Sequence, residues 1–315
     1  MLHTMVGVCC LFIIQFMLQL ITSDPAHAQA AAETFSITPS FTLQMRQDLS
    51  LRRARAQIVG NALGPDLRYE LDVSLSKGNT SELSLKDFFL HYTVNPGLHW
   101  QGGLFKIPLS EQFAVSGTQQ QFTERSIAHQ AFSPGRATGV SLFGDIYTPA
   151  WFYQVGVFQA PESRPETIAP GFFGSLQYEP RGAYGQGESD WEATPQPRMR
   201  FKTALWQAPG LSTKASMFGG VKWRGGSLNT HAFGAWETHT FNWGAYAQLG
   251  YFLWFQRLEA VARSAFLSTD GFQQEYAVGL NYYFQEHRFK LQSDYRWLVQ
   301  ETLTQQWLAQ VQVLF

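Results

Sequence analysis

Apolar and polar residues alternate strictly along much of this chain, and this pattern restricts its possible folds more than any other feature. Residues 275–284 place Tyr276, Val278 and Leu280 on one face and polar or small residues on the other, and residues 67–76, 288–297 and 306–315 repeat the pattern. Alternation with a period of two over about ten residues is typical of a β-strand whose two faces meet different surroundings. The sequence therefore predicts an all-β protein.

The alternating segments number about sixteen, an even count that would place both ends of a closed antiparallel barrel on one side. They lie near residues 35–45, 49–61, 67–76, 83–94, 98–107, 137–144, 151–158, 172–178, 199–206, 213–224, 227–237, 244–253, 256–267, 273–284, 287–299 and 305–315.

A soluble sandwich and a membrane barrel share this alternation, and the composition of the two faces separates them. The polar faces carry Arg, Glu, Asp and Gln in nearly every segment, whereas Tyr, Trp and Phe gather near the ends of the apolar faces. In a membrane barrel the apolar face meets lipid and the polar face lines the interior, with aromatic girdles at both interfaces. We therefore expect a transmembrane β-barrel. With 23 basic and 24 acidic residues, the chain has no strong positive electrostatic field that would attract nucleic acid.

The first residues have the features of an export signal. Residues 6–21 form one apolar run, and Ala26-His27-Ala28 follows as an A-x-A cleavage site. This predicts a signal peptide over residues 1–28 and a barrel over residues 29–315, located in a Gram-negative outer membrane. An uncleaved anchor is the alternative, because no Lys or Arg precedes the run. Both cysteines fall inside it, so the mature chain would have no disulfide.

The connections between strands differ in length. Short turns near residues 60–66, 95–97, 224–226 and 285–287 contain Gly, Pro or polar residues and suit the periplasmic end of a barrel. The long stretch Pro108–Arg136 would lie on the extracellular side, and we expect it to fold into the barrel. Residues 179–198 do not fit, because they are long where a periplasmic turn is expected. Either a strand pair is hidden there, giving fourteen or eighteen strands in all, or they are an insertion.

Sequence motifs for catalysis, cofactors and metals are missing. There is no G-x-S-x-G, Walker or H-E-x-x-H motif, and the histidines are scattered singly. We therefore expect no enzyme, no cofactor and no metal site. Two alternatives remain open: an outer-membrane hydrolase that would use Ser126 with His129, and a non-conducting structural or adhesin barrel with a lumen plugged by residues 179–198.

Several short motifs occur in order along nearly all of the mature chain. They are Lys86–Phe89 (KDFF), Gly103–Pro108 (GLFKIP), Thr123–Ser126 (TERS), Ser133–Arg136 (SPGR), Leu258–Arg263 (LEAVAR) and Val278–Phe284 (VGLNYYF). Together they resemble the phosphate-selective porin O and P family of outer-membrane porins.

The resemblance implies a homotrimeric barrel of sixteen strands in outer-membrane lipid, whose third loop folds into the lumen. It also implies a passive channel for small polar solutes or ions, with phosphate or other anions as the family's substrates. The terminal Phe315 is similar to the signal by which such barrels are recognised for insertion.

The charges of Pro108–Arg136 are the first candidates for a pore constriction. Arg125 and Arg136 stand against Glu111 and Glu124, and the stretch contains no Lys. Opposed charges of this kind can form an eyelet with a transverse field, or Glu124 and Arg125 can anchor the loop to the wall. Because the formal charge is zero, we expect weak anion selectivity.

Charged residues on the polar strand faces are candidates for lining the lumen. Basic residues along such a face would form a ladder that lowers the barrier for anions. Alternatively, each arginine is paired with a nearby acid, as in an ordinary polar wall. The candidates are Arg53, Arg55, Arg68, Glu70, Asp72, Arg263, Arg288, Lys290 and Arg296.

Overall fold

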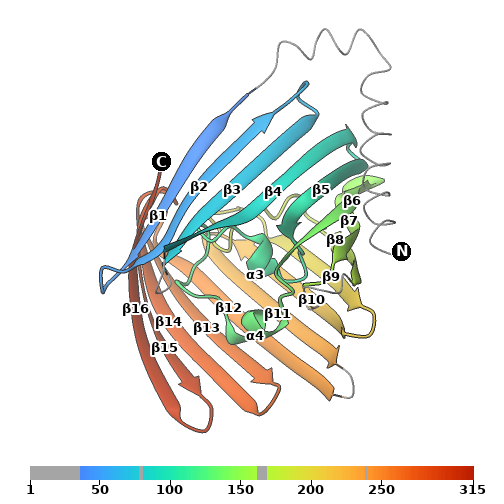
Figure 1. Cartoon of the computed structure of the whole chain (residues 1–315). Coiled ribbons are helices and arrows are strands. Elements are labelled where there is room, and N and C mark those ends of the chain that lie inside the picture. The colour runs from blue at the N-terminus through green and yellow to red at the C-terminus, as the bar shows by residue number, and fades with distance from the viewer. Residues whose placement is uncertain (1–35, 78–80, 162–168, 238–239) are drawn as a thin grey trace, which may run out of the picture.

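The computed structural model describes residues 36–77, 81–161, 169–237 and 240–315. The predicted signal peptide, residues 1–28, lies outside this range. The described residues form one closed antiparallel barrel of sixteen strands, in which every strand pairs with its neighbours in the sequence (Figure 1). None of their helices is long and apolar enough to cross a membrane.

The strands match the alternating segments one for one, so the predicted barrel is confirmed. The first eight are β1 (Thr38–Arg46), β2 (Leu51–Asn61), β3 (Leu67–Lys77), β4 (Ser81–Asn95), β5 (Leu98–Lys106), β6 (Arg136–Ile146), β7 (Thr148–Gln159) and β8 (Pro170–Tyr178). The second eight are β9 (Arg198–Ala208), β10 (Ser212–Trp223), β11 (Gly226–Glu237), β12 (Thr240–Trp254), β13 (Leu258–Ser268), β14 (Phe272–Gln285), β15 (Phe289–Val299) and β16 (Leu303–Leu314).

The barrel closes where the last strand meets the first. β1 and β16 pair in antiparallel register, with Thr42 opposite Leu314. Beyond that pair, the Phe315 amide donates to the Phe41 carbonyl at 2.9 Å, and the Phe41 amide donates to the Phe315 carbonyl at 3.1 Å. Closure leaves no free sheet edge, and in a bilayer every backbone group must find its partner inside the protein.

The two faces of the strands differ as the alternation predicts. Val278 and Leu280 on the outer face of β14 are 48% and 51% exposed, whereas the inward Asn281 is 1% exposed. The interior also has apolar regions, which the sequence did not predict. One contains Phe105, Ile107, Phe158, Phe173 and Trp206, and a second contains Ala128, Phe132, Phe233 and Tyr246. These inward apolar side chains pack against chain that lies inside the barrel rather than against water.

Residues 179–197, between β8 and β9, are an insertion and not a hidden strand pair. Apart from an isolated bridge between Pro180 and Gly182, no described residue in this segment pairs as a strand. We call this segment the β8–β9 insertion. Connections that follow an even-numbered strand lie at the same end of the barrel as both termini, so the insertion starts from that end.

The long connection between β5 and β6, residues 107–135, is called the β5–β6 loop. It contains two short helices, α3 (Glu111–Ala114) and α4 (Ile127–Phe132), which lie within the ring of strands in Figure 1. α4 packs against β11, β12 and β13, while other loop residues bond to β1 and β15. Only a segment inside the barrel can contact strands so far apart in the ring, and we infer that the loop runs through the lumen.

The outward face of β14 provides a test of the lipid-facing side. We expect Val278→Arg, near the middle of the strand, to destabilise the barrel in lipid by about 2–4 kcal/mol, because it places a charge in hydrocarbon. Gln101→Arg, which faces the inside, is the matched control and should cost far less. Urea titration in lipid vesicles, followed by the shift in gel mobility on heating, measures both. Equal costs would contradict the assignment of the faces.

Candidate functional site

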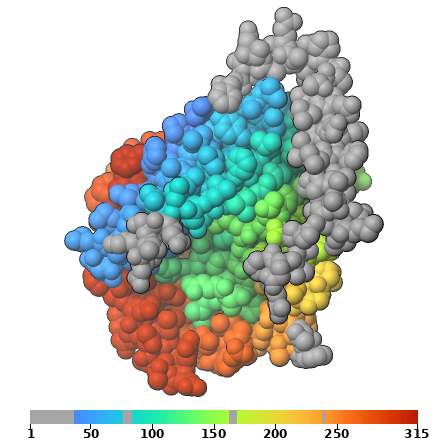
Figure 2. Space-filling model, viewed as in Figure 1, coloured from blue at the N-terminus to red at the C-terminus, as the bar shows by residue number. Residues whose placement is uncertain are grey.

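The interior has a cavity of about 590 Å³ on one side of the barrel, and a second cavity, of about 940 Å³, lies between the β5–β6 loop and β13 to β16. The wall of the 590 Å³ cavity comes from β1 to β5, β7, β9 and the end of β16, and its inner boundary comes from the β5–β6 loop and the β8–β9 insertion. In Figure 2, green atoms from the middle of the chain fill the space between the teal strands and the orange strands. The passage therefore occupies only part of the barrel cross-section. Its polar and charged lining residues include Arg53, Arg55, Glu70, Asp72, Asp87, Lys106, Glu111 and Arg200.

Glu111, at the start of α3, anchors one end of the loop to the wall. It receives hydrogen bonds from Arg200 (Nη1 to Oε1, 2.5 Å) and Lys202 (Nζ to Oε2, 3.5 Å), both on β9. Burial by itself would raise the pKa of Glu111, but Lys202 and Arg200 outweigh it and hold the pKa at about 2. The carboxylate is therefore ionised throughout the physiological pH range and is already neutralised by the wall.

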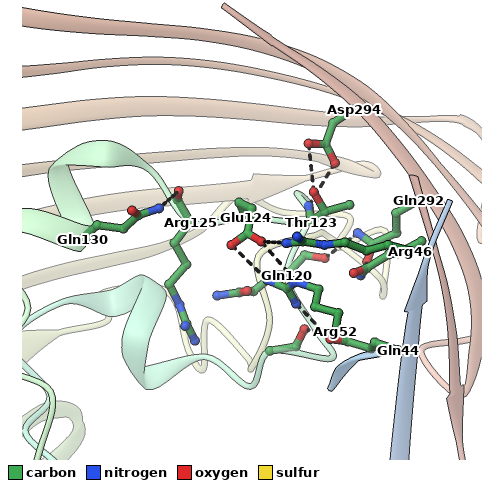
Figure 3. A network of polar contacts seen from close by, with 12 residues as sticks. Gln44, Arg46, Arg52, Gln120, Thr123, Glu124, Arg125, Gln130, Gln292 and Asp294 are labelled. Atoms are coloured by element: carbon green, nitrogen blue, oxygen red, sulfur yellow. Dashed lines mark hydrogen bonds and ion pairs between the residues drawn. The ribbon is translucent and has the colours of Figure 1, made fainter. Parts of the chain in front are cut away.

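Glu124 anchors the middle of the loop. Arg46 and Arg52 converge on its carboxylate, with Arg52 Nε at 3.2 Å from Oε1 and Nη2 at 3.1 Å from Oε2 (Figure 3). Burial acts to raise the pKa of Glu124, but the two arginines overcome it and lower the pKa. Arg263 also donates to the Glu124 carbonyl at 3.0 Å. These contacts join Glu124 of the loop to β1 and β2.

Arg125 and Arg136 behave differently from Glu124. Arg125 extends away from Glu124 in Figure 3 and donates to the Gln112 carbonyl at 2.9 Å, so it does not anchor the loop to the wall. Arg136 forms a bidentate pair with Asp87 on β4, at 3.0 and 2.8 Å. Burial lowers the pKa of Arg125 to about 10, which leaves it charged at neutral pH. The guanidinium groups of Arg125 and Arg136 and the Lys106 amine all lie 5.3–5.6 Å from the Phe113 ring centre.

Polar wall residues on the other side of the barrel satisfy the loop backbone. Asp294 on β15 accepts from both the amide and the hydroxyl of Thr123 at 3.0 Å (Figure 3). Lys290 donates to the Gln120 carbonyl at 3.0 Å. Glu275 on β14 accepts from the Ile127 amide at 2.9 Å. These inward residues therefore bind the loop backbone and do not line a water-filled passage.

Three of the proposed lumen-lining cations belong to this anchoring region. The Arg263 side chain is fully buried and pairs with Glu275. Arg296 also pairs with Glu275, at 3.3 Å, and Lys290 is completely buried beneath the loop. Arg288 differs again: it is exposed in the turn between β14 and β15, outside the strands. The inward basic residues of β15 therefore form no open ladder, because Lys290 lies beneath the loop and Arg296 pairs with Glu275.

The remaining candidates lie in or near the passage. Arg55 pairs with Asp72 at 3.3 Å, and Glu70 accepts from Gln57 at 2.8 Å. Arg68 is half exposed and lies 3.5 Å from Glu70. Arg53 is the exception, since no carboxylate in the described parts of the chain forms an ion pair with it.

Arg53 lies against the loop rather than against another wall residue. A Cβ added at Gly117 would fall only 1.9 Å from its Nη1 atom, so only a residue without a side chain allows this close approach.

Several residues that the structure places at the site were not among the candidates predicted from the sequence. They are Arg46, Arg52, Glu179, Glu188, Arg200 and Lys202. Arg200 and Lys202 share the inward face of β9, and their two-residue spacing was the available signal. Nothing in the local pattern shows that their partner, Glu111, lies 89 residues earlier in the chain.

The proposed Ser126–His129 pair is not formed as a catalytic pair. The Ser126 hydroxyl caps α4 by accepting from the His129 backbone amide at 3.1 Å and donates to Gln112 at 2.9 Å. The His129 ring instead lies 2.7 Å from the Ser110 hydroxyl, and both residues are buried. Burial, followed by the nearby Arg125, lowers the pKa of His129 well below its usual value. Among the described residues, no three His, Cys, Asp or Glu side chains are arranged to hold a metal.

Comparison with known proteins agrees with this geometry. The family model of phosphate-selective porin O and P matches residues 28–198, more than half of the chain. Comparison with curated proteins gives no significant match.

Solved structures share the barrel at low sequence identity. The outer-membrane channel DcaP of Acinetobacter baumannii has 11% identity and a TM-score of 0.60, covering 90% of this chain and 98% of that one. The anion-selective porin from Comamonas acidovorans has 13% identity and a TM-score of 0.55, covering 89% and 98%. The in-vitro folded OmpT of Vibrio cholerae, in trimer form, has 9% identity and a TM-score of 0.53, covering 90% and 100%. At these identities the likeness establishes the fold alone.

The Glu111 anchor predicts a specific pH dependence. Glu111→Gln should destabilise the folded chain by about 3 kcal/mol at pH 7, because Arg200 and Lys202 lose a buried partner. The folded pKa is depressed, so this contribution is fully present above the ordinary value of 4.5 and disappears as the pH falls to about 2. Denaturant titrations of both proteins between pH 7 and 2 measure it. A stability difference that stayed constant down to pH 2 would contradict the assignment.

Proposed function

This chain belongs to the phosphate-selective porin O and P family and is an outer-membrane diffusion channel, and we propose that its passage favours small anions over cations only weakly. The observation that carries the proposal is an asymmetry of charge pairing around the cavity. Its acids are neutralised by wall or loop cations, whereas some of its cations have no acidic partner.

The acids of the passage are bound to cations. Asp72 pairs with Arg55, Asp87 pairs with Arg136, and Glu111 pairs with Arg200 and Lys202. A carboxylate held in this way attracts a passing cation less, because its field is largely cancelled at short range. Glu70 is the most weakly compensated acid, with Arg68 at 3.5 Å.

The cations are only partly compensated. Within the described residues, Arg53 and Lys106 have no ion pair, and both line the cavity. Lys106 contacts the Ala114 carbonyl at 3.5 Å and the Phe113 ring, both neutral groups. Formal charge along the lining is balanced, so the resulting preference for anions is modest. The zero formal charge of the loop gave the same expectation, although Glu111 and Glu124 are neutralised by wall residues and not by Arg125 or Arg136.

The mechanism is sieving followed by weak electrostatic selection. The β5–β6 loop narrows the lumen, and a solute passes along the β1–β5 side beside Arg53 and Lys106. Binding at such cations must be weak enough for the solute to leave, as conduction requires. We assign no chemical step to any of these residues.

The cellular setting is proposed from the sequence and the family. Residues 1–28 would direct export and be removed, leaving residues 29–315 as a barrel in outer-membrane lipid. A homotrimer is proposed because the matched OmpT structure is described as a trimer. The exposed terminal Phe315 would act as the insertion signal.

Charge selectivity is tested by reversal potentials in a KCl gradient across a planar bilayer. The wild-type channel should show a small preference for chloride, and Arg53→Gln should reduce it, because the variant removes an unpaired cation from the passage. Arg288→Gln is the control, since it removes the same charge from an exposed turn. If both variants shifted the reversal potential equally, Arg53 would not be the selecting residue.

Phosphate provides a second test of the weak preference. We expect chloride current to be only slightly reduced when phosphate is added, because in the described residues only Arg53 and Lys106 face the cavity without an ion pair. Strong block by phosphate would show that the passage holds anions tightly. Purified, folded protein that carried no current at all would refute the channel function itself.

A further inference from the structure

The β8–β9 insertion crosses the inside of the barrel from the end opposite to the β5–β6 loop. Its residues contact inward side chains from β9 to β14, and its middle contacts the loop. The sequence had suggested this segment only as the plug of a non-conducting barrel, and the family resemblance does not predict a second constriction at this position.

The first part of the insertion is fixed to β9, β10 and β11. Glu179 accepts from Arg200 Nε at 2.7 Å and from the Tyr184 amide at 2.9 Å. The Tyr184 hydroxyl donates to Asn229 at 2.7 Å, and its ring lies under the Arg200 guanidinium (4.9 Å) and the Lys222 amine (4.4 Å). Because Tyr184 is 3% exposed, this contact is a packed one and not a surface contact.

Glu188 lies where the two inward segments meet. One of its carboxylate oxygens accepts from the Gln121 backbone amide and from the Gln248 side chain, both at 2.8 Å. Gln121 belongs to the β5–β6 loop, and Gln248 lies on the wall at β12. Glu188 is 5% exposed. A single buried carboxylate thus joins the insertion, the loop and the wall.

The last part of the insertion returns along the barrel end. The Trp191 ring packs against Tyr283 on β14, with ring centres 4.9 Å apart. Asp190 accepts from the Gly225 amide at 2.7 Å, and the Thr194 carbonyl accepts from the Arg224 amide at 3.0 Å. Both contacts fix the insertion to the turn between β10 and β11.

We propose that the β8–β9 insertion is a fixed second constriction of the channel and that Glu188 is the residue that positions it against the β5–β6 loop. The two segments enter from opposite ends and meet on the β9–β15 side of the lumen. Gln186 and Gly187 of the insertion and Gln119 of the loop border the cavity on the β1–β5 side. The width of the passage is therefore set by both segments.

The constriction is fixed rather than mobile because its buried polar groups have partners. Lys222 donates to the Gly187 carbonyl at 3.0 Å, and Asn229 donates to the Glu188 carbonyl at 3.2 Å. Withdrawing the insertion would leave these groups and the Glu188 carboxylate to be rehydrated, and it would leave the Gln121 amide without its partner.

The proposal rests on the diffusion-channel function and is tested by shortening the insertion. Replacing residues 182–195 with a short Gly-containing turn keeps Glu179, and hence the Arg200 pair. Single-channel conductance in KCl should rise by about twofold or more, because pore width controls conduction. Heat-dependent gel mobility shows whether the shortened barrel has folded. Unchanged conductance in a folded variant would overturn the proposal, whereas a silent wild-type protein would instead overturn the channel function.

A point variant tests the role of Glu188 without shortening the chain. Glu188→Ala removes the acceptor shared by Gln121 and Gln248, so the open-channel current should show more frequent brief fluctuations. Glu188→Gln retains one carbonyl acceptor, so its current should fluctuate less often than that of Glu188→Ala. If the Ala variant were as quiet as the wild type, Glu188 would not position the two segments.

A disulfide tests whether the constriction stays in place during conduction. An ideal Cβ at Gly187 lies 3.5 Å from the Gln119 Cβ, at the lower end of the separation of about 3.5–4.5 Å that a disulfide needs. We expect the double variant Gln119→Cys, Gly187→Cys to cross-link and to conduct equally when oxidised and when reduced. Block on oxidation that reductant reverses would show a moving gate and contradict a fixed constriction.

The single Gly187→Cys variant is the control for backbone strain. Gly187 has a φ of 80°, which disfavours any residue with a side chain. If this variant folds and conducts but the double variant forms no disulfide, the two segments are not apposed in the membrane and the proposal fails.

Discussion

Hydrogen bonding between the wall and the chain segments inside the barrel is the interaction on which the rest of this structure depends. A segment that leaves the sheet and enters the lumen loses water around its backbone, and each buried amide or carbonyl then needs a partner. Asp294, Glu275 and Lys290 provide partners for the β5–β6 loop. Lys222 and Asn229 do so for the β8–β9 insertion. The inward face of the wall is polar in this half because its side chains provide the hydrogen bonds that water would otherwise give to the enclosed segments.

Charge compensation follows from the same arrangement and decides what the channel can select. An acid that anchors a loop needs buried cations, and Arg200, Lys202, Arg46 and Arg52 meet this need at Glu111 and Glu124. These cations are then not free to attract solutes. In the mechanism we propose, selection falls to the few cavity charges that take no part in anchoring, of which Arg53 is the clearest.

The strands could be predicted closely, whereas the candidate site could be predicted only in part. All sixteen segments were found, and the largest shift in a boundary is at β12, which begins at Thr240 rather than near 244. Glu111 lies in the long loop as expected, whereas Arg136 is the first residue of β6, and the partners of both residues were not known. Arg53 and Lys290 are both basic residues on the polar face of a strand, and the two strands have a similar alternation and composition. One borders the passage and the other lies under the loop, because the fold and not the local pattern decides which wall the loop covers.

The sequence by itself determined the barrel, its strand order and the side of each connection, since period-two alternation and parity are properties of neighbouring residues. It also identified residues 179–198 as unusual for a turn. Only the tertiary structure decided that this segment runs inside the barrel and meets the β5–β6 loop at Glu188. Contacts between residues 67 positions apart, or 138 positions apart as between Gln121 and Glu259, depend on how the closed sheet curves. No local periodicity records them, and for that reason the width and charge of the passage had to come from the fold.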